Sequence, residues 1–237
     1  MKTRRISESQ VVVIALMAIA AVLLVIGTVG GSRAALTYSE TYATELSMQD
    51  IGVVLNENKN PVENGGTLLK NILGEDKAFK VGKEYEEILT VTNDGTIDQY
   101  VRVTLYKYWQ DAEGKRVDLS PAYIKLALGT ENWIVDTAAS TDERTVLYYR
   151  LPLAQNETTS AVLTAVSVDN ELIKLVKQTM TTEGKYTTVT NTYKYDSVSL
   201  GLKAEVDAVQ AHNGEDAIMS AWGARVSIAD DGTLSLG

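Results

Sequence analysis

The strongest constraint on the fold of this chain is the alternation of side-chain character between Tyr85 and Trp109. In the second half of this segment, polar and aromatic residues alternate with the aliphatic residues Val101, Val103 and Leu105. A period of two places the aliphatic side chains on one face of a β-sheet. The segment Asn93-Asp94-Gly95 separates the two halves and contains residues that tolerate positive φ. We therefore expect two antiparallel strands joined there by a turn.

Shorter runs of the same kind follow, separated by turn residues, and they bring the expected total to about ten strands. Near the C-terminus, we predict a strand at Tyr186–Tyr195 that pairs with a strand at Val198–Val209. A last hairpin is predicted to turn at Asp231-Gly232. Helical spacing of apolar residues predicts short helices at 68–73, at 170–182 and, after a capping Asn213, at 215–222.

No internal repeat and no long linker divides the chain. The expected fold class is mainly β: a jelly-roll-like antiparallel β-sandwich with two or three short helices, formed by residues 35–237 and preceded by an N-terminal apolar signal helix.

Residues 1–34 have the pattern of an export signal. Basic residues precede an uncharged apolar run, Val11–Val29, and small residues follow it. Ser32 and Ala34 satisfy the small-residue rule for a signal peptidase, which predicts cleavage between Ala34 and Ala35. The apolar run is also long enough to span a bilayer, so an uncleaved membrane anchor is the alternative. The membrane is expected to be a partner only through this leader.

Charge and cysteine content restrict the partners further. The chain carries a net charge of −9, and loss of residues 1–34 removes four basic and one acidic side chain, which leaves −12. A surface of this sign repels phosphate backbones, so we expect no nucleic-acid partner. The absence of cysteine means that an exported domain must be held together by its core and its sheet hydrogen bonds. We expect a secreted protein of a bacterial surface.

No motif specifies a reaction. The chain has one histidine, His212, and no cysteine, so the common zinc sites cannot form. A nucleophile elbow Gly-x-Ser-x-Gly is absent. Paired acids occur as sequence neighbours, for example Glu86-Glu87, and neighbours in a strand point to opposite faces. Asp230-Asp231-Gly232 is expected to form a tight turn. We therefore predict no catalytic residue, no metal-binding residue and no cofactor.

Three parts of the chain together resemble the TasA/camelysin group of exported proteins. The first is the long leader with the small residues Gly30–Ala35 after it, which is similar to the leaders of SipW-type signal peptidase substrates. The second is the pair of predicted strands that contain Leu89–Thr96 and Tyr100–Val103. The third is the late run Ala204–Gln210, together with the following helix that ends in Ser220-Ala-Trp-Gly223. The resemblance is patchy but extends over most of the chain.

The resemblance implies a jelly-roll sandwich, export from a Gram-positive-type bacterium, and a role in surface or biofilm-matrix fibres. It also implies that an N-terminal strand freed by processing completes the sheet of the next subunit, so that the main partner is another copy of the chain. The matching donor segment is residues 35–46, and its candidate residues are Ala35, Leu36, Tyr38, Tyr42 and Leu46. Camelysin is named as a metalloprotease, but the usual ligands are missing from this sequence, so we do not carry that activity over.

Two other function classes remain open at this stage. A surface adhesin that binds carbohydrate would be favoured by one outer face bearing Tyr106, Tyr108, Tyr148 and Tyr149. A metallopeptidase or glycosidase that uses carboxylates is the remaining alternative. The leading hypothesis is a structural protein that assembles by strand addition.

Overall fold

Strand β5 (Gln99–Asp111) lies in the middle of a six-stranded antiparallel sheet in the computed structural model. The structure describes residues 37–38, 50–70, 72, 80–195 and 197–237, all within the compact unit of residues 36–237. The sheet order is β1 (Thr37–Tyr38), β13 (Ser199–Gln210), β5, β9 (Arg144–Tyr149) and β8 (Trp133–Asp136), and β6 (Gly114–Lys115) pairs with the end of β5.

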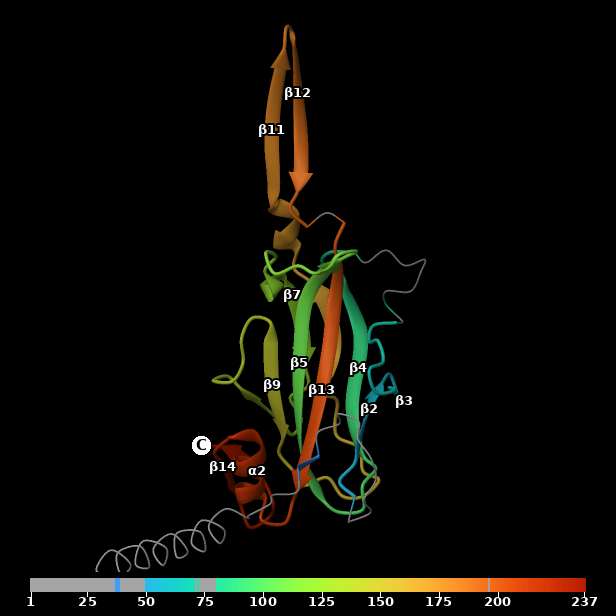
Figure 1. Cartoon of the computed structure of the whole chain (residues 1–237), viewed down its shortest axis with the longest axis vertical. Coiled ribbons are helices and arrows are strands. Elements are labelled where there is room, and N and C mark those ends of the chain that lie inside the picture. Colours follow the sequence, from blue (N-terminus) through green and yellow to red (C-terminus); the bar gives the residue numbers. More distant parts are fainter. Residues whose placement is uncertain (1–36, 39–49, 71, 73–79, 196) are drawn as a thin grey trace, which may run out of the picture. The chain divides into compact units, whose positions relative to one another are not determined.

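A second antiparallel sheet packs against the first and completes a β-sandwich (Figure 1). Its order is β3 (Asn60–Pro61), β2 (Val53–Glu57), β4 (Glu84–Asn93), β10 (Leu163–Val168) and β7 (Ile124–Leu128). One hydrophobic core lies between the sheets and includes Leu89, Val91, Val101, Val103, Leu105 and Leu147. Burial of one such side chain contributes about 1.5–3 kcal/mol. The predicted mainly-β sandwich is confirmed, and the faces assigned to the aliphatic residues are those that the core buries.

The connection between β4 and β5 is different from the predicted hairpin. Strand β4 pairs with β2 and β10, and β5 pairs with β13 and β9, so the connection crosses from one sheet to the other. The buried Asn93 side chain holds this crossing, because its Nδ2 donates to Ile97 O and to Leu153 O, both at 2.8 Å. Alternation could not separate the two possibilities, since both strands bury one face in the same core.

The C-terminal part covers the outer face of the six-stranded sheet at one end. Helix α2 (Gly214–Trp222) and the hairpin of β14 (Val226–Ile228) and β15 (Leu234–Leu236) form a second core with Tyr148 and Val209. The predicted helix and tail hairpin are therefore confirmed. Asn213 occupies the N-cap position, but it lies in the left-handed region at φ +52° and makes no side-chain capping hydrogen bond.

The helix predicted at 68–73 is absent from the part of this segment that the structure describes, which is residues 68–70 and 72. Turns take its place, and Ile72 N donates to Leu69 O at 2.9 Å. The apolar spacing has another cause: Leu68, Leu69 and Ile72 are buried in the sandwich core.

The helix predicted at 170–182 is also wrong beyond its first turn. A 3₁₀ helix, η2 (Asn170–Lys174), is followed by β11 (Val176–Glu183), which pairs with β12 (Tyr186–Tyr193). The other short 3₁₀ helix, η1 (Pro121–Tyr123), precedes β7. β12 therefore does not pair with β13, contrary to the prediction. The β-branched residues of β11 favour an extended chain, and Gly184, at φ +62°, begins the two-residue turn.

We call residues 176–193 the ribbon. Its two strands pair only with each other among the described strands (Figure 1), and its described side chains are all exposed.

Candidate functional site

The outer border of β13 is the candidate site. Along its whole length β13 pairs with β5, from Ser199 opposite Gln110 to Gln210 opposite Gln99. On its other side, β1 pairs only with Val209 and Ala208. Within the described part of the chain, residues 199–207 therefore have no strand on this side. Unpaired backbone groups on such a border are the template on which a further strand adds.

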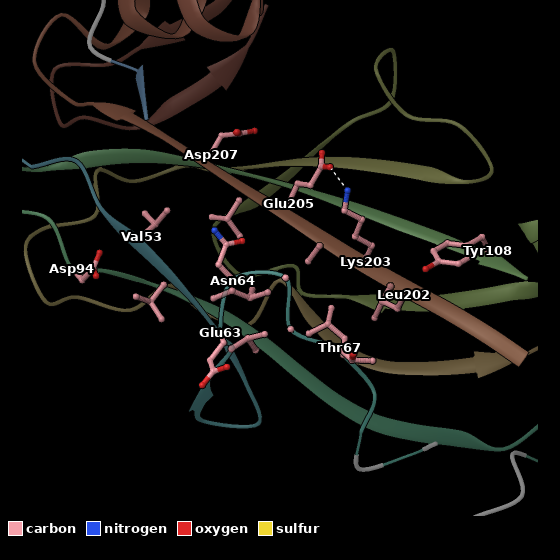
Figure 2. Close-up of a pocket in the computed structure, with 18 residues that line it drawn as sticks. Val53, Glu63, Asn64, Thr67, Asp94, Tyr108, Leu202, Lys203, Glu205 and Asp207 are labelled. Atoms are coloured by element: carbon pink, nitrogen blue, oxygen red, sulfur yellow. Dashed lines mark hydrogen bonds and ion pairs between the residues drawn. The ribbon is translucent and has the colours of Figure 1, made fainter. Parts of the chain in front are cut away.

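A groove of about 840 Å³ lies beside this border. Figure 2 shows β13 along one side, with the loop that carries Glu63, Asn64 and Thr67 on the other. Residues 202–207 of β13, residues 53–55 of β2 and residues 62–68 form most of its lining. The groove therefore follows the border of β13, with β2 and residues 62–68 across from it.

Apolar and acidic side chains share the groove. Leu202, Val206 and Val53 supply apolar surface, and a Cβ at Gly201 would overlap the Tyr108 ring that lies at one end. Among the described residues of the lining, the carboxylates are those of Glu63, Asp94, Glu205 and Asp207, and the cation is Lys203. An extended segment that presents alternate apolar side chains fits such a surface.

Two ion pairs fix the charged side chains of the border. Lys203 Nζ lies 2.6 Å from Glu205 Oε1, and its hydrogen bond holds the pKa of that carboxyl below the usual value (Figure 2). Arg102 binds Asp207 through Nε at 3.0 Å and Nη2 at 2.6 Å. These pairs orient the side chains that an added strand would meet, and they leave the backbone of the border open.

The loop wall of the groove, residues 62–69, is tied to the five-stranded sheet through two carboxyl groups. Leu69 N donates to Glu57 Oε1 at 2.6 Å. The neighbouring Glu87 is fully buried, and its Oε2 accepts from Asn58 Nδ2 at 3.2 Å. No sequence pattern predicted this pair, since Glu57 and Glu87 are thirty residues apart and meet only when β2 pairs with β4. A charged residue at an inward position of an alternating strand is the one signal that could have indicated it.

The residues predicted for export and assembly fall mostly outside the described part of the chain. This applies to the cleavage positions Ala34 and Ala35 and to Leu36, Tyr42 and Leu46 of the donor segment. Tyr38 is described as part of β1, where it pairs with Ala208. The predicted donor segment therefore begins, within its own chain, on the border of β13.

The four tyrosines considered for carbohydrate binding do not share an outer face. Tyr148 and Tyr149 are buried on opposite sides of β9, the first against Trp222 and the second against Trp133. Tyr106 and Tyr108 are half-buried on β5. The observation that would have favoured an adhesin is therefore missing.

The other sequence candidates lie at the surface or in turns. His212 is exposed just before α2, and Asp230-Asp231-Gly232 forms the predicted turn, in which Thr233 N donates to Asp231 Oδ1 at 2.9 Å. Among the described residues, no group of three or more histidine, cysteine or acidic residues could hold a metal ion. In that same part of the chain, no helix is long and apolar enough to cross a membrane.

Comparisons of the chain with family models, with curated proteins and with solved structures give no match. Its function must therefore be argued from its own residues.

Proposed function

We propose that this protein is a secreted structural protein of the bacterial cell surface or biofilm matrix, and that copies of it assemble into fibres by adding a strand to the β13 border. The observation that carries the proposal is the border at residues 199–207, which has no strand beside it in the described part of the chain and lies next to a groove of about 840 Å³. The export signal and the resemblance to the TasA/camelysin group support the location. The border supports the mechanism, because backbone hydrogen bonds supply affinity and the groove selects alternate side chains.

The pairing of β1 supplies the register in which residues 35–46 of a neighbouring copy would add as the donor, in place of the chain's own β1. Thr37 lies opposite Val209 and Tyr38 opposite Ala208. Continued in the same antiparallel register, Tyr42 falls opposite Ala204 and Leu46 opposite Leu200. Both β13 residues contribute to the sandwich core. The larger apolar side chains of the donor would therefore enter the groove, while Thr41 and Glu45 would face outward.

The proposal is tested by deleting residues 35–46 and examining purified protein by electron microscopy at rising concentration. We expect the protein that starts at Ala35 to form fibres and the truncated protein to remain a soluble, folded domain. A synthetic peptide of residues 35–46 should protect the backbone amides of residues 199–207 from hydrogen exchange in the truncated protein. A peptide of the same composition in scrambled order serves as the control.

Fibres of normal length from the truncated protein would show that another segment joins the copies. Absence of fibres from the protein that starts at Ala35, at every concentration, would remove the proposed function itself.

A further inference from the structure

The half-buried Glu57 and the fully buried Glu87 form a pair of neighbouring carboxyl groups. Glu87 is fully buried in β4, and its Oε1 has no hydrogen-bond donor among the described residues. Its other oxygen accepts from the Asn58 side chain. Asn58 in turn fixes the strand next to it, since its Oδ1 accepts from Ile88 N at 3.0 Å. A buried carboxylate oxygen without a donor is costly, and a proton on the Glu87 carboxyl group would remove that cost.

The segment held by this pair is strained. Asn58, Lys59 and Leu69 all lie in the left-handed region, at φ +50°, +71° and +66°. Asn58 and Lys59 form the two-residue turn between β2 and β3, where positive φ is favoured, whereas for Leu69 this conformation costs about 1–2 kcal/mol. Leu69 is also almost fully buried, and its backbone N–H donates to Glu57. The loop therefore keeps its shape only while its attachments to β2 and β4 persist.

The charges around Glu87 favour a bound proton. Burial is the main cause that raises the pKa of this carboxyl from 4.5 to about 8, followed by the hydrogen bond and the charge of Glu57. The Asn58 side chain and the Leu69 backbone act in the opposite direction. None of the described groups that act most strongly on Glu87 is a lysine or an arginine. Burial and the neighbouring Glu57 therefore favour the protonated form of Glu87 at neutral pH.

We propose that the proton shared by Glu57 and Glu87 fastens residues 62–69 to the five-stranded sheet, and that its loss at alkaline pH releases this wall of the groove. The role of this release in assembly rests on the proposed function, because the same wall would contact an added strand. The release itself is a property of the single copy.

The sign of the pH dependence follows from the direction of the shift. The folded state binds this proton more tightly than the unfolded chain, whose carboxyl groups titrate near 4.5. The contribution of the pair to stability is therefore complete below pH 4.5. It decreases as the pH rises and is lost as the pH passes about 8. Above that value Glu87 carries a negative charge in a buried position, and residues 62–69, which are attached beside it through Leu69 and Glu57, are the part free to move.

The test measures hydrogen exchange of the backbone amides of residues 57–72 at pH 6 and pH 9, corrected for intrinsic exchange rates. It compares the wild type with Glu87→Gln, which mimics the protonated side chain, and with Glu86→Gln. Glu86 is the matched control because it is the exposed neighbour on the other face of β4. We expect protection at Leu69 to fall at least tenfold at pH 9 in the wild type and in Glu86→Gln, and to persist in Glu87→Gln.

Equal loss of protection at pH 9 in Glu87→Gln, or full protection in the wild type, would overturn the inference. So would restoration of wild-type protection at pH 9 by millimolar calcium, because the pair would then bind a metal ion rather than a proton. If Glu87→Gln fails to fold, Glu57→Gln gives the same comparison from the other partner. Fibre formation is scored separately: the expected exchange pattern without fibres would remove the proposed function and leave this inference in place.

Discussion

The sandwich and the ribbon are both antiparallel β-structure, but they are held by different interactions. In the sandwich, each strand of the core buries one face against the opposite sheet, as Leu105 and Leu147 illustrate. In the ribbon, Met180 is 65% exposed and Tyr186 is 82% exposed, and among the described strands its two strands have no neighbour except each other (Figure 1). The comparison teaches that a strand pattern specifies an extended chain, whereas the stability of that chain depends on whether a second layer covers it.

The largest expected difference concerns core packing. Leu147→Ala should lower the free energy of unfolding by about 2–5 kcal/mol, because it leaves a cavity between the two sheets. Met180→Ala in the ribbon should change it by less than about 0.5 kcal/mol, since the side chain is already in water. Urea unfolding of the two variants measures both values. A large loss of stability in Met180→Ala would mean that the ribbon is packed against something in solution.

Buried hydrogen bonds should give the next largest difference. Asn93→Ala removes a buried amide that donates to two carbonyl groups in the crossing between the sheets, and we expect a loss of about 1–3 kcal/mol. The matched change is Asn191→Ala, whose partner Gln178 is exposed on the ribbon, and its cost should be close to zero. Thermal unfolding checks the pair. Similar melting temperatures for both variants would contradict the role given to Asn93.

Ion pairs should give the smallest difference. Arg102→Gln breaks the half-buried pair with Asp207 and the contact of Arg102 with the Trp222 ring, 5.0 Å from its centre, at a cost of about 1 kcal/mol. Lys174→Gln breaks the exposed pair with Glu171 next to the ribbon, and its cost should be at most about 0.5 kcal/mol. Added salt should weaken the second contribution more than the first. Denaturant midpoints at low and high salt measure both, and equal costs would place the Arg102 pair among ordinary surface pairs.

Local patterns were sufficient where one physical cause dominated. Alternation around Val101 identified β5 and its buried face, and Asp231-Gly232 identified the last turn, because period and turn chemistry are properties of neighbouring residues. The helix ending at Trp222 was found from its apolar spacing and its terminal Gly223, which lies at φ +66°. In each case the deciding contacts lie within a few residues along the chain.

Patterns failed where two structures share the same local signal. Apolar residues at 172–180 fit a helix, yet Val176 and Met180 lie on an exposed strand. The spacing of Leu68, Leu69 and Ile72 also fits a helix, but it comes from three residues of a loop that all enter the core. Asn93-Asp94-Gly95 fits a hairpin turn equally well as a crossing between sheets. Only the partners of each strand separate these alternatives.

The sequence by itself determined the class of the fold, the faces of its main strands and the acidic, cysteine-free character of the chain, because these follow from composition and from the two-residue repeat of a strand. The tertiary structure decided which strands pair, which border of β13 stays open, and that Glu87 meets Glu57. Those outcomes depend on contacts between residues far apart in the chain. No local preference encodes such contacts, since they form only when the two sheets close over a common core.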